Sequence, residues 1–238
     1  MPKIRFDVLT IFPSLFDCFL NESIINKAIK KGILKIDIHD VRNYITDKHK
    51  VVDDRPYGGG IGMVLKIDPF YNCLKSICRF KVLEKAKTTK KIEVLSKNTK
   101  IVLLGPRGKK FNQKKAYEYS KLNRLIMVAG RYEGIDERIK YLVDEEISIG
   151  DFVVMGGEVP AMMIIEAVSR LIPGVLGKPK LLDERITEDK GFIEYPQYTR
   201  PSIFEPKKGV KWEVPKVLLT GDHKKIAEWR QKKGKVVK

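Results

Sequence analysis

Apolar residues recur along the first 171 positions in short runs of strand type, and segments with helical apolar spacing separate them. The strand-type runs cover residues 4–11, 34–39, 101–104, 125–129 and 146–149. The segments with helical spacing cover residues 13–20, 23–31, 69–80, 113–119 and 160–171. This alternation predicts an α/β fold with a mostly parallel sheet that is flanked by helices. Residues 81–100 are Lys-rich and interrupt the pattern, so we expect an insertion or a mobile excursion there.

The texture of the sequence changes after Gly177. Residues 178–190 are charged and lack sustained periodicity, which predicts an interdomain linker. Residues 191–238 contain four prolines and a basic helix from about His223 to Lys233. We therefore expect a cofactor-binding and catalytic domain over residues 1–177, followed by a small, basic, largely helical module that is too short to hold a large core alone.

Three glycine-containing stretches each follow an apolar run of strand type. They are residues 105–108, 130–134 and 148–158. Because the carboxyl ends of parallel strands meet at one edge of a sheet, we expect three loops to converge on a pocket lined by backbone. A further run, Gly58-Gly59-Gly60-Ile61-Gly62, follows two acids, an arginine and Tyr57. It is typical of a substrate loop that moulds to a nucleotide, and the alternative is a long solvated turn.

The composition narrows the class of partner. The 238 residues are 43% apolar and carry a formal charge of +17, with a pI near 9.6, which favours a polyanionic partner. Nucleic acid is favoured over membrane, because no apolar run is long enough to span a bilayer. The N-terminus lacks the layout of a signal peptide, so we expect a cytoplasmic protein. Three cysteines without a CxxC pair and three histidines without ligand spacing predict neither disulfides nor a metal site.

Five segments resemble those of the bacterial tRNA (guanine-37-N1) methyltransferases of the SPOUT class, and they follow the order of that family. The segments are VDDRPYGGGIGM from Val52, GRYEGIDER from Gly130, SIGDFVVMGGEVPA from Ser148, SRLIPGVLG from Ser169 and YTRP from Tyr198. The resemblance implies an enzyme that transfers a methyl group from S-adenosylmethionine to N1 of guanine 37 in tRNA, next to the anticodon. It also implies a trefoil knot in the first domain, and a homodimer in which the knot pocket of one subunit faces the linker and second module of the other.

By position, the resemblance implies that residues of the three glycine-containing loops surround the methyl donor. These residues are Leu104, Gly105, Pro106, Gly130, Tyr132, Glu133, Ile149, Gly150, Asp151, Phe152, Val153, Val154, Gly156, Gly157 and Pro160. Glycine and proline fix tight turns and keep side chains out, so that backbone N–H and C=O groups can read the adenine edge. Glu133 and Asp151 would add acceptors or offset the positive sulfonium.

Methylation at N1 of guanine requires two catalytic groups. Since N1 carries a proton, a carboxylate must accept that proton, while a cation stabilises the charge that develops at O6. The resemblance implies Arg170 as the cation. The base stays open, because the linker departs from the family pattern: Asp189 reproduces a local match, whereas Asp183-Glu184 requires smaller changes in spacing. The resemblance also leaves open whether Mg²⁺ assists.

Two clusters of basic residues predict contacts with RNA phosphates. They are Arg107, Lys109, Lys110, Lys114 and Lys115 in the first domain, and Lys224, Lys225, Arg230, Lys232, Lys233 and Lys235 in the second module. Stacking of Tyr57 or Tyr198 on an unpaired base is a further hypothesis. The second module is abbreviated relative to the family pattern after Trp229-Arg230. Two other functions remain to be distinguished: an RNA-binding protein that keeps the knot fold but has lost the chemistry through its altered linker, and a ribose 2′-hydroxyl methyltransferase.

Overall fold

The structure, a computed structural model, describes residues 2–45, 47–83, 89–177 and 192–237. The chain divides into two compact units, residues 1–179 and 180–238. The predicted linker, residues 178–190, lies outside the described residues. In the part of the chain that is described, no helix is both long and apolar enough to cross a membrane.

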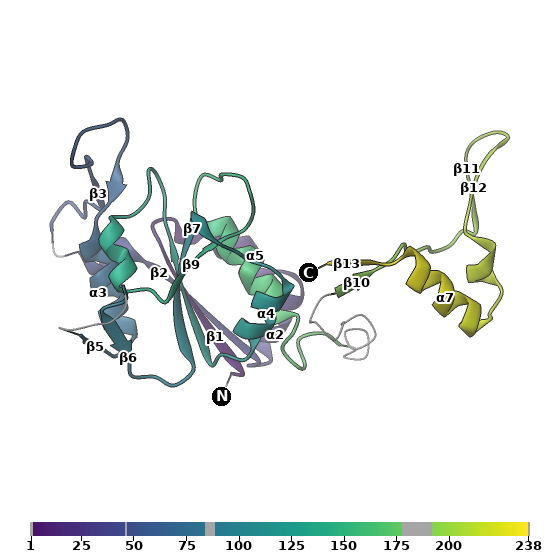
Figure 1. Cartoon of the computed structure of the whole chain (residues 1–238), viewed down its shortest axis with the longest axis horizontal. Helices are drawn as coiled ribbons and strands as arrows, with labels where there is room; N and C mark the ends of the chain where they lie inside the picture. The colour runs from purple at the N-terminus through teal and green to yellow at the C-terminus, as the bar shows by residue number, and fades with distance from the viewer. Residues whose placement is uncertain (1, 46, 84–88, 178–191, 238) are drawn as a thin grey trace. The chain divides into compact units, whose positions relative to one another are not determined.

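The first unit is built on a five-stranded sheet with the strand order β2-β1-β8-β7-β9 (Figure 1). The strands are β1 (Ile4–Thr10), β2 (Leu34–Asp40), β7 (Thr99–Lys110), β8 (Arg124–Ala129) and β9 (Glu145–Ser148). Every pairing within this sheet is parallel. The predicted α/β class with a mostly parallel sheet is therefore confirmed.

Helices cover both faces of the sheet. On one face lie η1 (Pro13–Phe16), α1 (Asp17–Asn21), α2 (Ser23–Lys30), α4 (Gln113–Ser120) and α5 (Glu158–Ser169), and on the other lie η2 (Val41–Tyr44), α3 (Ile67–Ile77) and η3 (Glu137–Tyr141) (Figure 1). A hydrophobic core lies on each face of the sheet. Because side chains alternate across a strand, residues of β1 pack in both cores. Phe6 and Val8 pack in the core that contains α5, whereas Leu9 packs in the core that contains α3.

The first unit also contains two antiparallel strand pairs outside the central sheet. The predicted excursion at residues 81–100 instead forms an antiparallel pair, β5 (Phe80–Val82) and β6 (Ile92–Val94), although residues 84–88 lie outside the described part. Buried Ile92 and half-buried Phe80 pack in the α3 core and attach this hairpin to the first unit. The second pair, β3 (Asp53–Asp54) and β4 (Val64–Leu65), flanks the Gly58–Gly62 run.

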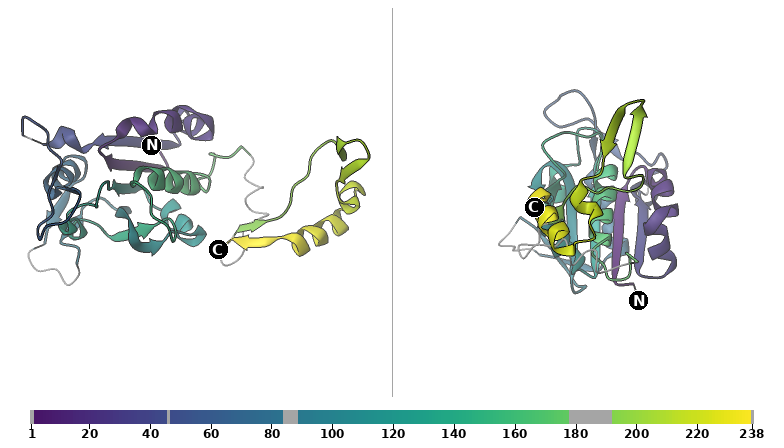
Figure 2. Two further views of the ribbon diagram at one scale, coloured as in Figure 1. Left: turned by 90° about the horizontal axis from the view of Figure 1, so that it is seen from above. Right: turned by 90° about the vertical axis from the view of Figure 1, so that its right-hand side faces the viewer.

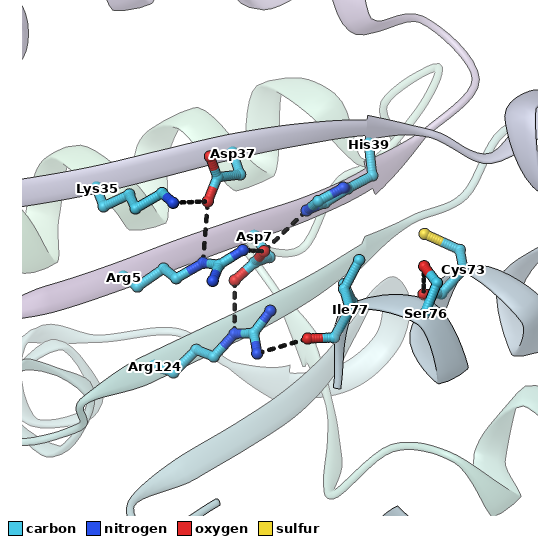
Figure 3. A network of polar contacts seen from close by, with 9 residues as sticks. All are labelled: Arg5, Asp7, Lys35, Asp37, His39, Cys73, Ser76, Ile77 and Arg124. Atoms are coloured by element: carbon cyan, nitrogen blue, oxygen red, sulfur yellow. Dashed lines mark hydrogen bonds and ion pairs between the residues drawn. The ribbon is translucent and has the colours of Figure 1, made fainter. Parts of the chain in front are cut away.

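Asp7 of β1 is fully buried, and basic groups surround it (Figure 3). Arg124 of β8 donates from Nε to Asp7 at 2.7 Å, and His39 Nε2 of β2 lies 2.8 Å from the carboxylate. Burial alone would raise the pKa of Asp7. Hydrogen bonds from His39 and Arg124, with the charges of Arg124 and Arg5, outweigh burial and hold that pKa below its ordinary value. Asp7 thus ties β1 to both neighbouring strands.

The second unit combines short strands with one helix. Its elements are β10 (Phe192–Glu194), β11 (Ile203–Lys207), β12 (Val210–Glu213), η4 (Lys216–Leu219), α7 (His223–Lys233) and β13 (Lys235–Val237). The basic helix forms where the sequence predicts it, and Asp222 caps it by accepting from the backbone N–H groups of Lys224 and Lys225. Two antiparallel pairs, β10 with β13 and β11 with β12, add strands that the helical prediction did not include. The β11–β12 hairpin extends away from α7 (Figure 2).

Candidate functional site

Three loops converge in the first unit on a pocket of about 530 Å³. One loop follows β8, and another follows β9. A further loop interrupts β7, where the register with β9 shifts between Leu104 and Lys109. Sequence reasoning treats residues 105–108 as a loop after a strand, whereas the structure keeps them inside β7 as an irregular segment. The predicted convergence is present, since all three glycine-containing stretches contribute lining residues. A volume of this size is in the range of small-molecule and cofactor sites.

The structure brings together most of the residues that sequence reasoning assigns to methyl donor binding. The pocket is lined by Leu104, Gly105, Pro106, Gly130, Tyr132, Glu133, Ile149, Phe152, Val153, Val154, Gly156, Gly157 and Pro160. Gly150 and Asp151 are not among its lining residues. Asp151 forms an ion pair with Lys110 on the protein surface, and its expected place beside the donor stays a prediction.

Of the catalytic candidates, only Arg170 lies within the described residues, and it does not line this pocket. Arg170 is exposed and follows the last residue of α5, whereas Gly157 and Pro160 line the pocket at the other end of that helix. A twelve-residue helix is about 18 Å long. Asp189, Glu184 and Asp183 lie outside the described residues.

Close backbone approach explains two glycines of the pocket loops. A Cβ atom at Gly157 would lie 2.6 Å from Cα of Ala129, where β8 ends, and Gly157 donates its N–H to the carbonyl of Gly130 at 2.9 Å. A Cβ at Gly108 would lie 2.4 Å from the backbone nitrogen of Ile147 in β9. Both contacts are against backbone, which cannot move aside as a flexible side chain can. The glycines therefore let the loops pack directly on neighbouring strands.

A buried ionic network connects the loop after β8 with the loop after β9, and the sequence analysis did not assign it a role. Glu158, at the start of α5, is fully buried; it accepts from Thr10 Oγ1 at 2.7 Å and from Arg131 Nε at 2.8 Å. The guanidinium of Arg131 also lies 4.9 Å from the ring centroid of Phe12. Arg131 in turn forms an isolated antiparallel bridge with Gly156. The network thus joins the end of β1 to two walls of the pocket. The visible signal was the glutamate that follows two glycines directly before an apolar helix.

The Gly58–Gly62 run lies beside the loop after β8. Glu133 donates its backbone N–H to the carbonyl of Met63, and Leu65 donates to the carbonyl of Gly134 at 2.9 Å. Val64, four residues after Gly60, lines the pocket itself. The tip of the run is open to solvent, with Tyr57 and Ile61 almost completely exposed. The predicted substrate loop therefore borders the pocket and leaves its tip free for contacts with a ligand.

The basic cluster of the first unit is partly neutralised. Arg107 pairs with Glu137 at 2.7 Å, and this partner raises the pKa of Arg107. Lys110 pairs with Asp151, and Lys115 pairs with Glu118 at 2.8 Å and with Glu145 at 3.2 Å. Among the described residues, no ion pair is found for Lys109 and Lys114. The predicted RNA-binding charge is therefore weaker here than the sequence suggests.

The pocket carries acidic side chains from two of its walls. Glu133 comes from the loop after β8, Glu137 is the first residue of η3, and Glu146 comes from β9. The pKa of Glu137 lies below its ordinary value because Lys140 and Arg107 donate to its carboxylate. The described residues contain no group of three or more His, Cys, Asp or Glu side chains that could hold a metal ion.

A parallel α/β sheet with a loop-lined pocket beyond the carboxyl ends of its strands defines a protein of the nucleotide- or cofactor-binding α/β class. Comparison with known proteins gives the family. The model of the family described as tRNA (Guanine-1)-methyltransferase TrmD matches residues 4–237, and the chain belongs to this family.

Curated relatives match over nearly the whole chain. A tRNA (guanine-N(1)-)-methyltransferase from Dictyoglomus turgidum is 46% identical over 229 residues, which cover 96% of this chain and 84% of the relative. Proteins of the same name from Geobacter sulfurreducens and Carboxydothermus hydrogenoformans are each 47% identical, over 231 and 230 residues. These matches cover 97% and 96% of this chain, and 86% and 82% of the respective relatives.

Proposed function

We propose that this protein transfers a methyl group from S-adenosylmethionine to N1 of guanine 37 in tRNA. Family membership over residues 4–237 supports the reaction, and the pocket formed by three converging loops carries the proposal structurally. The strand order, in which β7 lies between β8 and β9, is compatible with the trefoil knot that the resemblance implies, and the knot forms part of the proposal. The proposal places the protein in the cytoplasm, where it would meet its tRNA substrate.

The residues of the pocket fit the methyl donor. Gly105 and Gly130 add no side chain to the pocket wall, so the adenine edge would meet N–H and C=O groups. Phe152 and Pro160 offer apolar surface for the flat ring. Glu133, for which no ion pair is found among the described residues, would face the positive sulfonium. When bound, S-adenosylmethionine supplies an electrophilic methyl group.

The remaining chemistry belongs to the chain's own residues. A carboxylate of the linker, Asp189 or alternatively Glu184 or Asp183, would accept the proton of guanine N1. The guanidinium of Arg170 would stabilise negative charge at O6. Asp136 and Arg138 are paired with each other at 2.6 Å and are therefore weaker candidates for these roles.

A homodimer is part of the proposal. Arg170 and the donor pocket lie at opposite ends of α5 within one chain, so an arginine from a partner subunit would complete the site. Apolar side chains beside the pocket are open to solvent, with Val153 83% and Met155 87% exposed. Val159 and Met163 continue this exposed surface along α5. Burial of such a patch against a second copy would be favourable.

The test is methylation of defined RNA. The purified full-length chain is incubated with labelled S-adenosylmethionine and either a tRNA transcript with G37 or the same transcript with A37, and the nucleosides are identified by mass analysis. We expect 1-methylguanosine with the first transcript and at least a 100-fold lower yield with the second. Methylation of a ribose would favour the 2′-hydroxyl alternative, and binding of both partners without methyl transfer would favour an RNA-binding protein. Parallel reactions with EDTA test for Mg²⁺ dependence.

A further inference from the structure

A second cavity, of about 320 Å³, lies entirely within the second unit, outside the pocket described above. Its lining includes Tyr198, Arg200, Leu219, Trp229 and Arg230. The lining includes two aromatic rings and two arginines, and no acidic side chain is found in it among the described residues. A cavity of this character is suited to a flat ligand that carries negative charge.

The aromatic wall presents two ring faces at different angles. The ring centroids of Tyr198 and Trp229 are 6.3 Å apart, and their planes meet at 61°. Tyr198 is 49% exposed and Trp229 is half-buried, so both rings are held by the fold but remain accessible. Unpaired RNA bases stack on rings presented in this way.

Charge at the rim favours a nucleotide. The guanidinium of Arg230 lies 5.1 Å from the ring centroid of Tyr195, which orients it beside the cavity. Arg200 lines the cavity and is exposed, so its guanidinium can contact a phosphate. Residues 192–238 contain twelve lysines and arginines against five aspartates and glutamates, so the surroundings also attract a polyanion.

The described side chains of the second unit do not fill this cavity. None of its side chains that the structure describes is fully buried, and Leu219, on the cavity wall, is 59% exposed. Val214, Leu218 and Ile226 are likewise only partly covered. A ligand that covers this apolar floor would gain the free energy of removing it from water.

We propose that this cavity binds one unpaired base of the RNA substrate, with Tyr198 and Trp229 in contact with the base and Arg200 with its phosphate. The inference rests on the proposed function for the identity of the RNA, and it adds a site for a base other than the methylated one. A segment of this protein, or a second copy of it, is the competing occupant.

The two tryptophans of the chain, Trp212 and Trp229, allow a direct test. Trp212→Phe leaves Trp229 as the sole tryptophan, and Trp229→Phe leaves Trp212, on the exposed β11–β12 hairpin, as the control reporter. Each full-length variant is titrated, without methyl donor, with an anticodon stem–loop RNA and with a fully paired RNA of equal charge. We expect the stem–loop to quench Trp229 at concentrations where the duplex leaves it unchanged.

Affinity measurements separate base stacking from charge. Tyr198→Ala should weaken stem–loop binding about 5- to 150-fold, the range expected for one stacked base, and leave the slope of affinity against salt unchanged. The matched control Lys224→Gln should instead reduce that slope, because it removes one phosphate contact. Far-ultraviolet circular dichroism of both variants checks that α7 is retained.

Three results would overturn the proposal. Trp229 could remain unaffected by saturating stem–loop RNA, the duplex could quench it equally, or its emission could change with protein concentration alone, which would indicate a second copy in the cavity. If the protein still methylates guanine N1 in any of these cases, the base site fails and the proposed function stands. Quenching of Trp229 without methylation would refute the proposed function and leave the base site intact.

Discussion

Glu158 accepts a hydrogen bond from Nε of Arg131 at 2.8 Å, and the carboxylate has no exposure to solvent. The charge of Glu158 is therefore balanced mainly by one guanidinium, with Thr10 as the second donor. Arg131 belongs to the loop after β8, and Glu158 belongs to α5, which follows the loop after β9. This pair therefore fixes the distance between two walls of the pocket.

We expect Glu158→Gln to weaken both the fold and methyl donor binding. The substitution leaves the guanidinium of Arg131 without its counter-charge, and disruption of a buried pair costs about 3–5 kcal/mol. Urea denaturation measures the free energy of unfolding, and titration calorimetry measures donor affinity. The control Glu166→Gln changes an exposed glutamate of the same helix and should alter neither quantity. Wild-type donor affinity in Glu158→Gln would show that the pair does not shape the pocket.

Gly157→Ala tests the contact between β8 and the loop after β9. The new Cβ would lie 2.6 Å from Cα of Ala129, so the loop must move outward. We expect a loss of about 1–3 kcal/mol of stability, which is typical of overpacking, together with at least a tenfold loss of donor affinity. In Gly177→Ala, the added methyl group meets no atom of the described residues within 4 Å and should be neutral. Equal donor affinity for the two variants would contradict this account of the pocket.

Asp7 predicts a component of acid sensitivity. The folded-state pKa of this carboxyl is lowered, so its contribution to stability is complete above the unfolded value of about 3.9 and is lost as the pH falls through the folded pKa. Asp7→Asn should cost about 3–5 kcal/mol at neutral pH and flatten the decline of stability below about pH 4. Denaturation curves at several pH values measure both effects. The exposed Asp47→Asn variant serves as the control, and an unchanged acid profile in Asp7→Asn would refute the prediction.

The three cysteines should differ in reactivity. Cys18 is exposed, whereas Cys73 is fully buried and burial raises the pKa of its thiol to about 12. Burial also raises the pKa of Cys78. Since the thiolate is the reactive form, we expect a thiol reagent at neutral pH to label one equivalent rapidly in the folded protein and three after unfolding. Cys18→Ser should remove the rapid phase; rapid labelling of that variant would mean that the α3 core opens readily.

The catalytic base can be assigned by substitution in the linker. Removal of a general base lowers the rate about 100- to 10,000-fold, so either Asp189→Asn or Glu184→Gln should show such a loss while donor affinity is kept. Single-turnover methylation of tRNA measures the rate, and Glu188→Gln is the neighbouring control. Near wild-type rates in both variants would direct attention to Asp183 or to another proton acceptor.

Much of the first unit could be predicted because its strands are apolar runs bounded by glycine and polar residues. The strand at Ile4–Thr10 and the helix at Ser23–Lys30 lie within one residue of the expected bounds. The Thr10–Glu158 hydrogen bond could not be predicted in this way, because it joins residues 148 positions apart. The extension of β7 through Gly108 was missed for a related reason: its pairing with β9 depends on register rather than on local composition.

The position of β7 between β8 and β9 has a consequence for biosynthesis. A nascent chain that ends before Glu145 lacks β9, so one side of β7 would display unpaired backbone amides and carbonyls. Such an open edge invites pairing with other chains. Release of truncated products from the ribosome should therefore yield insoluble material, whereas synthesis past α5 seals the edge and completes the walls of the pocket in the same step.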